Sequence, residues 1–74
     1  MKKKESDSIS NRVYEYRVLR RLSQEKLGEA VGVSKQTIYA MEKGNYSPSL
    51  LLAFKLANYF GVQIEDIFSY SKED

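Results

Sequence analysis

Residues 23–44 read SQEKLGEAVGVSKQTIYAMEKG, and this segment predicts two short helices joined by a tight turn. Ser23 and Ser34 each stand where a helix needs an N-cap, because a serine hydroxyl accepts a hydrogen bond from an unpaired N–H of the first turn. Gly32 lies between the two helices. A glycine takes a positive φ at little steric cost, so the chain can reverse there without a long loop. The inward apolar positions of the segment are Leu27, Val31, Val33, Ile38 and Met41.

The outer faces of these two helices are polar and basic. Their outward or end positions carry Gln24, Lys35, Gln36, Thr37, Ala40 and Lys43. A helix that presents short polar and basic side chains outward has the shape that enters the major groove of DNA. The charge distribution agrees, with seven basic and four acidic side chains between Ser10 and Leu50, but two basic and four acidic ones after Leu50. This asymmetry would orient the molecule on a polyanion.

The composition excludes several classes of protein. A chain of 74 residues has room for one domain, and it contains neither cysteine nor histidine. Disulfides, zinc sites, histidine acid–base catalysis and cysteine nucleophiles are therefore excluded. Glu65 and Asp66 resemble a catalytic pair, but we interpret them as negative charges at the positive end of a short helix. We expect a protein that is not an enzyme, with no cofactor, no metal and no small-molecule ligand.

The apolar runs are too short for a membrane span. The longest, Leu50 to Phe54, falls far short of the roughly 20 residues required, and no secretory apolar region follows the first lysines. We expect a cytoplasmic protein with no membrane partner, associated with the nucleoid.

The rest of the chain divides into an arm, three further helices and a tail. Residues 1–8 carry little apolar surface, which predicts a mobile arm whose Lys2–Lys4 run is a solubilising tail or a contact to phosphate. Residues 9–70 form the domain and 71–74 a C-terminal tail. The helical patterns run from Asn11 to Arg20, from Leu50 to about Tyr59 and from Ile64 to Phe68. Val18 and Leu19 lie outside the inner face of the first helix. They are either ordinary exposed apolar residues or a docking site for a partner.

The chain resembles the lambda-type repressor and Cro family of helix-turn-helix proteins, also called the xenobiotic-response-element family. The residues that carry the resemblance are Gln24, Leu27, Gly32-Val33-Ser34, Ile38, Glu42, Gly44, Pro48 and Gly61-Val62, and it covers nearly all of Ile9 to Phe68. It implies an all-α, five-helix DNA-binding domain whose helices 2 and 3 form the helix-turn-helix. Small members sometimes pair their termini as a β-ribbon, which here would join Ile9 to Ser69 and Tyr70.

Three positions depart from the family pattern. Gly28 replaces a usual alanine and weakens its helix by about 0.5–1 kcal/mol, while allowing a closer approach of the next helix. Arg21 replaces a helix-ending glycine, which predicts a left-handed residue strained by roughly 1 kcal/mol. Gln63 replaces a frequent serine cap. None of the three removes the fold.

The resemblance also implies which side chains contact DNA. The residues expected to read bases are Lys35, Gln36, Thr37 and Ala40. Those expected to contact the sugar-phosphate backbone are Gln24, Ser34, Tyr39, Lys43, Asn45 and Tyr46. Bidentate pairing suits Gln36 to adenine and Lys35 to guanine. The alternatives are a merely solvated helix face and, for Tyr39, packing against a neighbouring side chain.

Arg17 and Glu42 have a structural interpretation. Arg17 lies on the inner face of the first helix and Glu42 lies one turn after Ile38, which predicts a partly buried bidentate ion pair that holds the recognition helix against the first helix. In the family these positions pair. The alternative is two independent surface charges.

A single short recognition helix reads few bases, and the second half of the chain has surplus apolar residues. Both points predict a homodimer through Leu51, Tyr59, Val62, Ile64, Ile67 and Phe68, with recognition helices about 34 Å apart. The leading hypothesis is a transcriptional repressor that binds a palindromic operator in double-stranded DNA. The alternatives are an antitoxin or restriction-controller protein, or a protein-interaction module that uses the helix-turn-helix as a scaffold.

Overall fold

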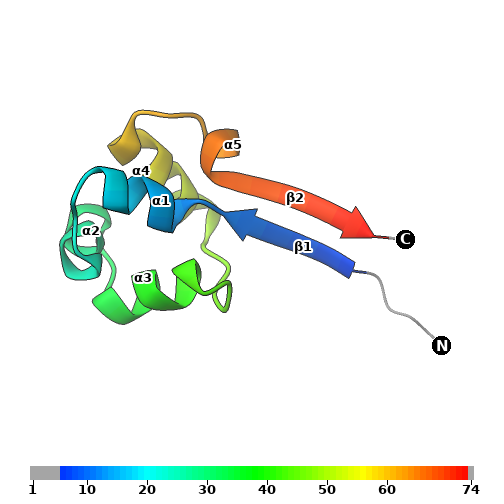
Figure 1. The fold of residues 1–74 in the computed structure, drawn as a ribbon, viewed down its shortest axis with the longest axis horizontal. Coiled ribbons are helices and arrows are strands. Elements are labelled where there is room, and N and C mark those ends of the chain that lie inside the picture. The colour runs from blue at the N-terminus through cyan, green and yellow to red at the C-terminus, as the bar shows by residue number, and fades with distance from the viewer. Residues whose placement is uncertain (1–5, 74) are drawn as a thin grey trace.

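The computed structural model describes residues 6–73 as five helices and two strands. In chain order the elements are β1 (Ser6–Asn11), α1 (Val13–Leu19), α2 (Gln24–Val31), α3 (Lys35–Glu42), α4 (Leu50–Phe60), α5 (Ile64–Ile67) and β2 (Phe68–Glu73). Figure 1 shows the helices gathered into one body, from which the two strands project side by side as a ribbon. The prediction of a five-helix domain is confirmed.

The core lies where the helices meet. Its buried side chains are Val13, Leu27, Val31, Ile38, Met41, Leu52, Ala53, Leu56, Ala57, Phe60 and Ile67. All five helices contribute, so each helix buries its apolar surface away from water only when the others are in place. No helix among residues 6–73 is long and apolar enough to cross a membrane.

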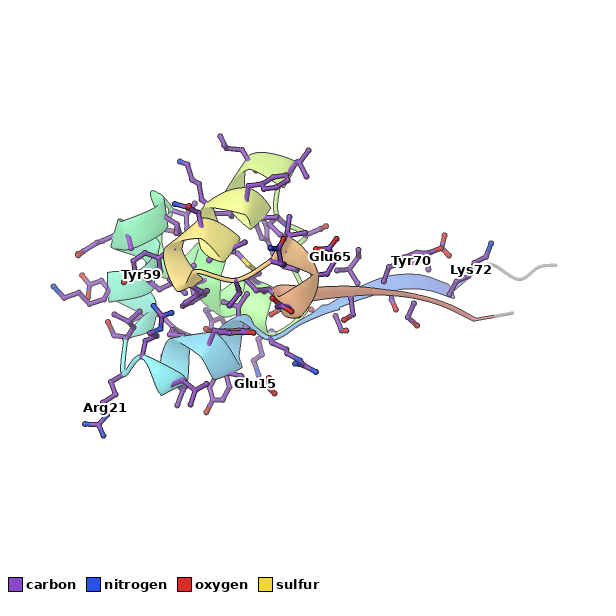
Figure 2. The ribbon with its side chains drawn as sticks, turned by 90° about the horizontal axis from the view of Figure 1, so that it is seen from above. Glu15, Arg21, Tyr59, Glu65, Tyr70 and Lys72 are labelled. Atoms are coloured by element: carbon purple, nitrogen blue, oxygen red, sulfur yellow. The ribbon has the colours of Figure 1, made fainter. Side chains whose placement is uncertain are left out.

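The first helix is shorter than the predicted span from Asn11 to Arg20. Asn11 ends β1, and its side-chain Oδ1 accepts a hydrogen bond from the Val13 N–H at 3.0 Å, which starts α1 two residues later. After the other end of α1, Arg21 takes a left-handed φ of 56°. This conformation was predicted because Arg21 replaces a helix-ending glycine of the family. Figure 2 shows its side chain pointing away from the body, at the end opposite the ribbon.

The ribbon joins the two ends of the described chain. β1 and β2 are antiparallel, with Ile9 opposite Tyr70 and Ser10 opposite Ser69. This pairing confirms the expected β-ribbon. Its base is fixed to the body because the Arg12 N–H donates to the Ile67 carbonyl at 2.8 Å. Farther out, the Tyr70 hydroxyl donates to Asp7 Oδ1 at 3.1 Å.

The ribbon corrects the predicted chain ends. Ser6 to Ser8 were expected within a mobile arm of residues 1–8, but they are strand residues of β1. Ser71 to Glu73 were expected in a tail, yet they belong to β2. Backbone pairing between segments some 60 positions apart explains both errors, since neither segment has an apolar pattern of its own. Lys2–Lys4 and Asp74 lie outside the described residues.

The ends of α4 and α5 also differ slightly from their predicted positions. Ser49 caps α4, as predicted, and the helix runs one residue farther than expected, to Phe60. Gly61 then stops it in a left-handed conformation. Gln63 precedes α5, which ends at Ile67, one residue before its predicted end. The Gln63 backbone N–H donates to Asp66 Oδ2 at 2.9 Å, which is the contact that the third helical residue makes in a capping box.

Candidate nucleic-acid interface

The turn between α2 and α3 has the predicted local structure. Ser23 Oγ accepts from the Lys26 N–H at 3.0 Å, and Ser34 Oγ accepts from the Thr37 N–H at 3.1 Å. Gly32 takes a φ of 82° between the two helices. Each helix therefore begins at a defined residue, which fixes the position of the first turn of α3 relative to the body.

Gly28 is the point at which the turn approaches α2. A Cβ added to Gly28 would lie 2.5 Å from the Val33 carbonyl oxygen, a distance that real Cβ atoms essentially never show. The Gly28 carbonyl itself accepts from the N–H groups of Gly32 and Val33, at 2.7 and 2.9 Å. The close approach expected from this glycine is thus made by the backbone of the turn.

The residues expected to read bases lie along α3. Lys35 and Gln36 are exposed, while Thr37 and Ala40 are half-buried. The Thr37 hydroxyl lies 3.0 Å from the Ser34 hydroxyl, and one of the two donates to the other. None of the four side chains belongs to the core. They are available on one helix, in the first two turns after its cap.

Five of the six residues expected to contact the DNA backbone are exposed, and they lie just before α3, within it and just after it. The exposed ones are Ser34, Tyr39, Lys43, Asn45 and Tyr46. The Lys43 ammonium lies 5.6 Å from the centre of the Tyr39 ring, close enough for a cation–π attraction at the end of α3.

Arg17 and Glu42 form the predicted ion pair. Arg17 Nε donates to Glu42 Oε2 at 2.6 Å and its Nη2 donates to Oε1 at 3.2 Å, while Nη1 donates to the Leu22 carbonyl at 2.7 Å. The hydrogen bond to Glu42 raises the pKa of Arg17 above its ordinary value, against the opposing effect of burial. The guanidinium therefore stays charged, and α3 is fastened to α1 by a bidentate contact.

Gln24 adds a third donor to the same carboxylate. Its Nε2 donates to Glu42 Oε1 at 3.1 Å, and its side chain is half-buried. The expected role of Gln24 was a contact to a DNA phosphate. An amide NH₂ has two hydrogens, so the bond to Glu42 uses one and leaves the other for a second acceptor.

A shallow hollow lies where α1, α2 and α3 meet. Its walls are Tyr14, Arg17, Gln24, Tyr39, Glu42 and Lys43. Sequence reasoning did not single out Tyr14, which is 56% exposed with the Arg17 guanidinium carbon 5.3 Å from its ring centre. Its position one turn before Arg17 was the available signal.

The surface expected to form a dimer is only partly exposed. Leu51 and Tyr59 are 66% and 38% exposed. Three further residues are half-buried against the core: Val62, Ile64 and Phe68. The prediction for Ile67 was wrong, because its side chain is 1% exposed and belongs to the core of the chain.

Comparison with known proteins agrees with this geometry. Residues 13–67, from the start of α1 to the end of α5, match the family model described as helix-turn-helix. A protein of Methanocaldococcus jannaschii, named an uncharacterised HTH-type transcriptional regulator, is 54% identical over 89% of this chain and 100% of its own length. The transcriptional repressor RstR of the cryptic phage CTXphi in Vibrio cholerae is 41% identical over 86% of this chain and 58% of its own.

Among solved structures, the transcriptional regulator VanUg matches with a TM-score of 0.71 and 28% identity, over 90% of this chain and 89% of its own. These relatives are named as regulators, so the prediction that the protein is not an enzyme is confirmed by its family. The chain belongs to the helix-turn-helix family, as its resemblance to the lambda-type repressors predicted.

Proposed function

We propose that this protein is a sequence-specific DNA-binding repressor that binds a palindromic operator as a homodimer. The proposal is carried by one observation: α3 presents Lys35 and Gln36 to solvent from a capped first turn, while the Arg17–Glu42 ion pair holds the same helix rigidly on the body. A rigid helix with exposed polar side chains can enter the major groove without reordering. Residues 9–70 serve as the DNA-binding and dimerisation domain in this proposal.

The proposed base contacts follow from side-chain chemistry. Gln36 donates to and accepts from the major-groove edge of an adenine, and Lys35 donates to a guanine, while Thr37 or Ala40 touches a thymine methyl group. Each matched pair contributes about 1–3 kcal/mol of discrimination. The residues proposed to contact sugar and phosphate are Gln24, Ser34, Tyr39, Lys43, Asn45 and Tyr46, which fix the register of the protein on the duplex.

Two considerations support a repressor that acts as a dimer. The related RstR protein is named a transcriptional repressor. A two-fold pair would double the number of bases read, and the exposed Leu51 and Tyr59 offer apolar surface for it. A protein that occupies an operator acts in the compartment that holds the DNA, which for this chain is the cytoplasm and its nucleoid.

The test is a titration of genomic DNA fragments against the protein at two salt concentrations. We expect enrichment of a palindromic sequence and an affinity that falls steeply with salt, because phosphate contacts release counterions. Gln36→Ala should alter the enriched sequence, whereas Lys26→Gln, at an exposed position of α2 whose ammonium pairs with Glu29, should leave it unchanged. Failure of the wild-type protein to bind any duplex at low salt would contradict the proposal.

A second function is favoured by exposed apolar residues on α1. Val18 and Leu19 are 46% and 79% exposed, which suits a protein-interaction module built on the helix-turn-helix. Binding through such a face buries apolar surface and releases few counterions. A partner captured with the same affinity at both salt concentrations, together with no DNA binding, would favour this alternative.

A further inference from the structure

The hollow between α1, α2 and α3 carries two tyrosines, one amide and one unneutralised cation at its rim. Its titratable groups are Tyr14, Arg17, Tyr39, Glu42 and Lys43. Arg17 and Glu42 neutralise each other through their bidentate contact. Lys43 therefore leaves the hollow with a net positive charge, in a position beside the recognition helix.

The carboxylate in the hollow accepts three hydrogen bonds. Glu42 accepts two hydrogen bonds from Arg17 and one from Gln24. A carboxylate paired in this way repels an incoming anion less than an unpaired one, because the guanidinium at 2.6 Å compensates its charge. The bond also fixes the Gln24 amide plane, which directs its second N–H away from Glu42.

Tyr14 brings a neutral donor to the same place from α1. Its ring rests against the Arg17 guanidinium, with 5.3 Å between the guanidinium carbon and the ring centre. Arg17 is itself held by Glu42 and by the Leu22 carbonyl, so the ring has a fixed support. More than half of the Tyr14 surface is exposed.

We propose that this hollow binds one phosphodiester group of the DNA backbone, and that Tyr14 is a DNA-contacting residue. Three donors of different kinds then converge on one phosphate: the Tyr14 hydroxyl, the second amide hydrogen of Gln24 and the Lys43 ammonium. Glu42 and Arg17 are positioning residues, since they orient Gln24 and Tyr14 without touching the phosphate. The inference rests on the proposed DNA-binding function and adds a contact from α1.

The different charges of these donors make the site testable. A lysine that neutralises a phosphate makes binding more sensitive to salt. Each such phosphate makes the plot of log affinity against log salt concentration steeper by about 0.9. A tyrosine hydroxyl carries no charge, so its loss weakens binding without changing that slope. Tyr14 and Lys43 should therefore behave differently, although they are proposed to hold the same group.

The experiment compares Tyr14→Phe, Lys43→Gln and Tyr70→Phe with the wild-type protein on sonicated genomic DNA over a series of salt concentrations. Tyr70→Phe is the matched control, because it removes a tyrosine hydroxyl from the ribbon, where that hydroxyl already donates to Asp7. We expect Tyr14→Phe to bind about tenfold more weakly per protomer with an unchanged slope. Lys43→Gln should bind more weakly, with a slope whose magnitude falls by about 0.9 per protomer, and Tyr70→Phe should bind like the wild type.

A second measurement uses the free protein and inorganic phosphate, and so does not depend on DNA binding. The side-chain NH₂ resonances of Gln24 should shift saturably with phosphate in the wild type, and much less in Lys43→Gln. Wild-type affinity in Tyr14→Phe, an equal loss in Tyr70→Phe, or an unmoved Gln24 amide would each overturn the phosphate site. Absence of DNA binding by the wild type would instead overturn the proposed function, and the phosphate titration separates the two failures.

Discussion

Arg17 Nε lies 2.6 Å from Glu42 Oε2, and the two side chains are only 12% and 7% exposed. The pair joins α1 to the end of α3, across 25 positions of sequence. A buried pair of this kind has taken two charges out of water, so the loss of one partner leaves the other uncompensated. The orientation of α3 therefore depends on a contact with Arg17, which lies outside the helix-turn-helix segment.

Removing one partner of this pair should lower the free energy of unfolding more than replacing both partners with apolar residues. We expect Arg17→Met to lower the free energy of unfolding by about 3–5 kcal/mol, and the double variant Arg17→Met/Glu42→Met to recover most of that loss. Urea unfolding followed by circular dichroism measures both. Arg12→Met is the control, because its pair with Glu15 is about two-thirds exposed and should cost less than about 1 kcal/mol. Equal losses in the single and double variants would contradict the buried-pair account.

The pair should also be insensitive to alkaline pH. The pKa of Arg17 is raised in the folded state, so its contribution to stability is fully present below the ordinary arginine pKa and is lost only as pH rises through the folded value. Urea midpoints of the wild type and Arg17→Met should therefore differ by a constant amount between neutral pH and pH about 10. A difference that shrinks within this window would assign the interaction to another group.

Gly28→Ala should destabilise the protein although alanine is the better helix former. The added Cβ would meet the Val33 carbonyl at 2.5 Å, and the backbone must shift to relieve the contact. We expect a net loss of about 1–3 kcal/mol, which exceeds the gain of about 0.5–1 kcal/mol from helix propensity. Ala30→Gly, at an exposed position of the same helix, measures the propensity effect alone. A more stable Gly28→Ala variant would show that the turn yields easily.

Arg21→Gly should stabilise the protein. Arg21 holds a φ of 56° with an exposed side chain, and glycine adopts this conformation without steric cost. We expect a gain of up to about 1 kcal/mol in the free energy of unfolding, reduced by the larger entropy of glycine in the unfolded chain. Leu19→Gly, at an exposed helical position two residues earlier, should lose about 1 kcal/mol. Thermal unfolding of both variants decides the sign.

Variants at Gln36 and Gln24 should differ in their effect on the sequence preference of DNA binding. Gln36→Ala should relax the preference at one operator position, by about 1–3 kcal/mol, because the amide reads a base edge. Gln24→Ala should weaken binding to all sequences alike, because a phosphate carries no sequence information. Binding measured on a library of single-base operator variants distinguishes the two patterns. Identical profiles for both variants would contradict the placement of α3 in the groove.

Self-association should depend on exposed rather than buried apolar residues. The double variant Leu51→Ser/Tyr59→Ser removes two exposed side chains and should weaken the proposed dimer in sedimentation equilibrium, with little change in protomer unfolding. Ile67→Ser should instead unfold the protomer, since this side chain is in the core. A double variant that associates like the wild type would move the dimer interface elsewhere.

Local signals in the sequence were enough to predict the helix-turn-helix. The hydroxyls of Ser23, Ser34 and Ser49 each accept from a backbone N–H three residues later. The left-handed conformation of Gly32 is one that glycine adopts at little steric cost. The apolar positions of α2 and α3 were predicted from spacing, because a helix that contributes to a core must turn its apolar stripe inward. The Arg17–Glu42 pair joins positions 25 residues apart, so its prediction needed both the helix faces that carry the two residues and the resemblance to the family.

Only the tertiary structure decided the features made by segments distant in sequence. The ribbon was expected from the resemblance alone, because it depends on β1 and β2 meeting and neither strand has the alternating apolar pattern that would predict it. The burial of Ile67 depends on how α5 packs, whereas its apolar character suited a core or an interface equally well. The hollow around Tyr14 and Gln24 exists because three helices converge there. The sequence by itself thus specified where helices begin, end and face, and packing decided which side chains share a surface, because only packing brings distant residues within hydrogen-bonding distance.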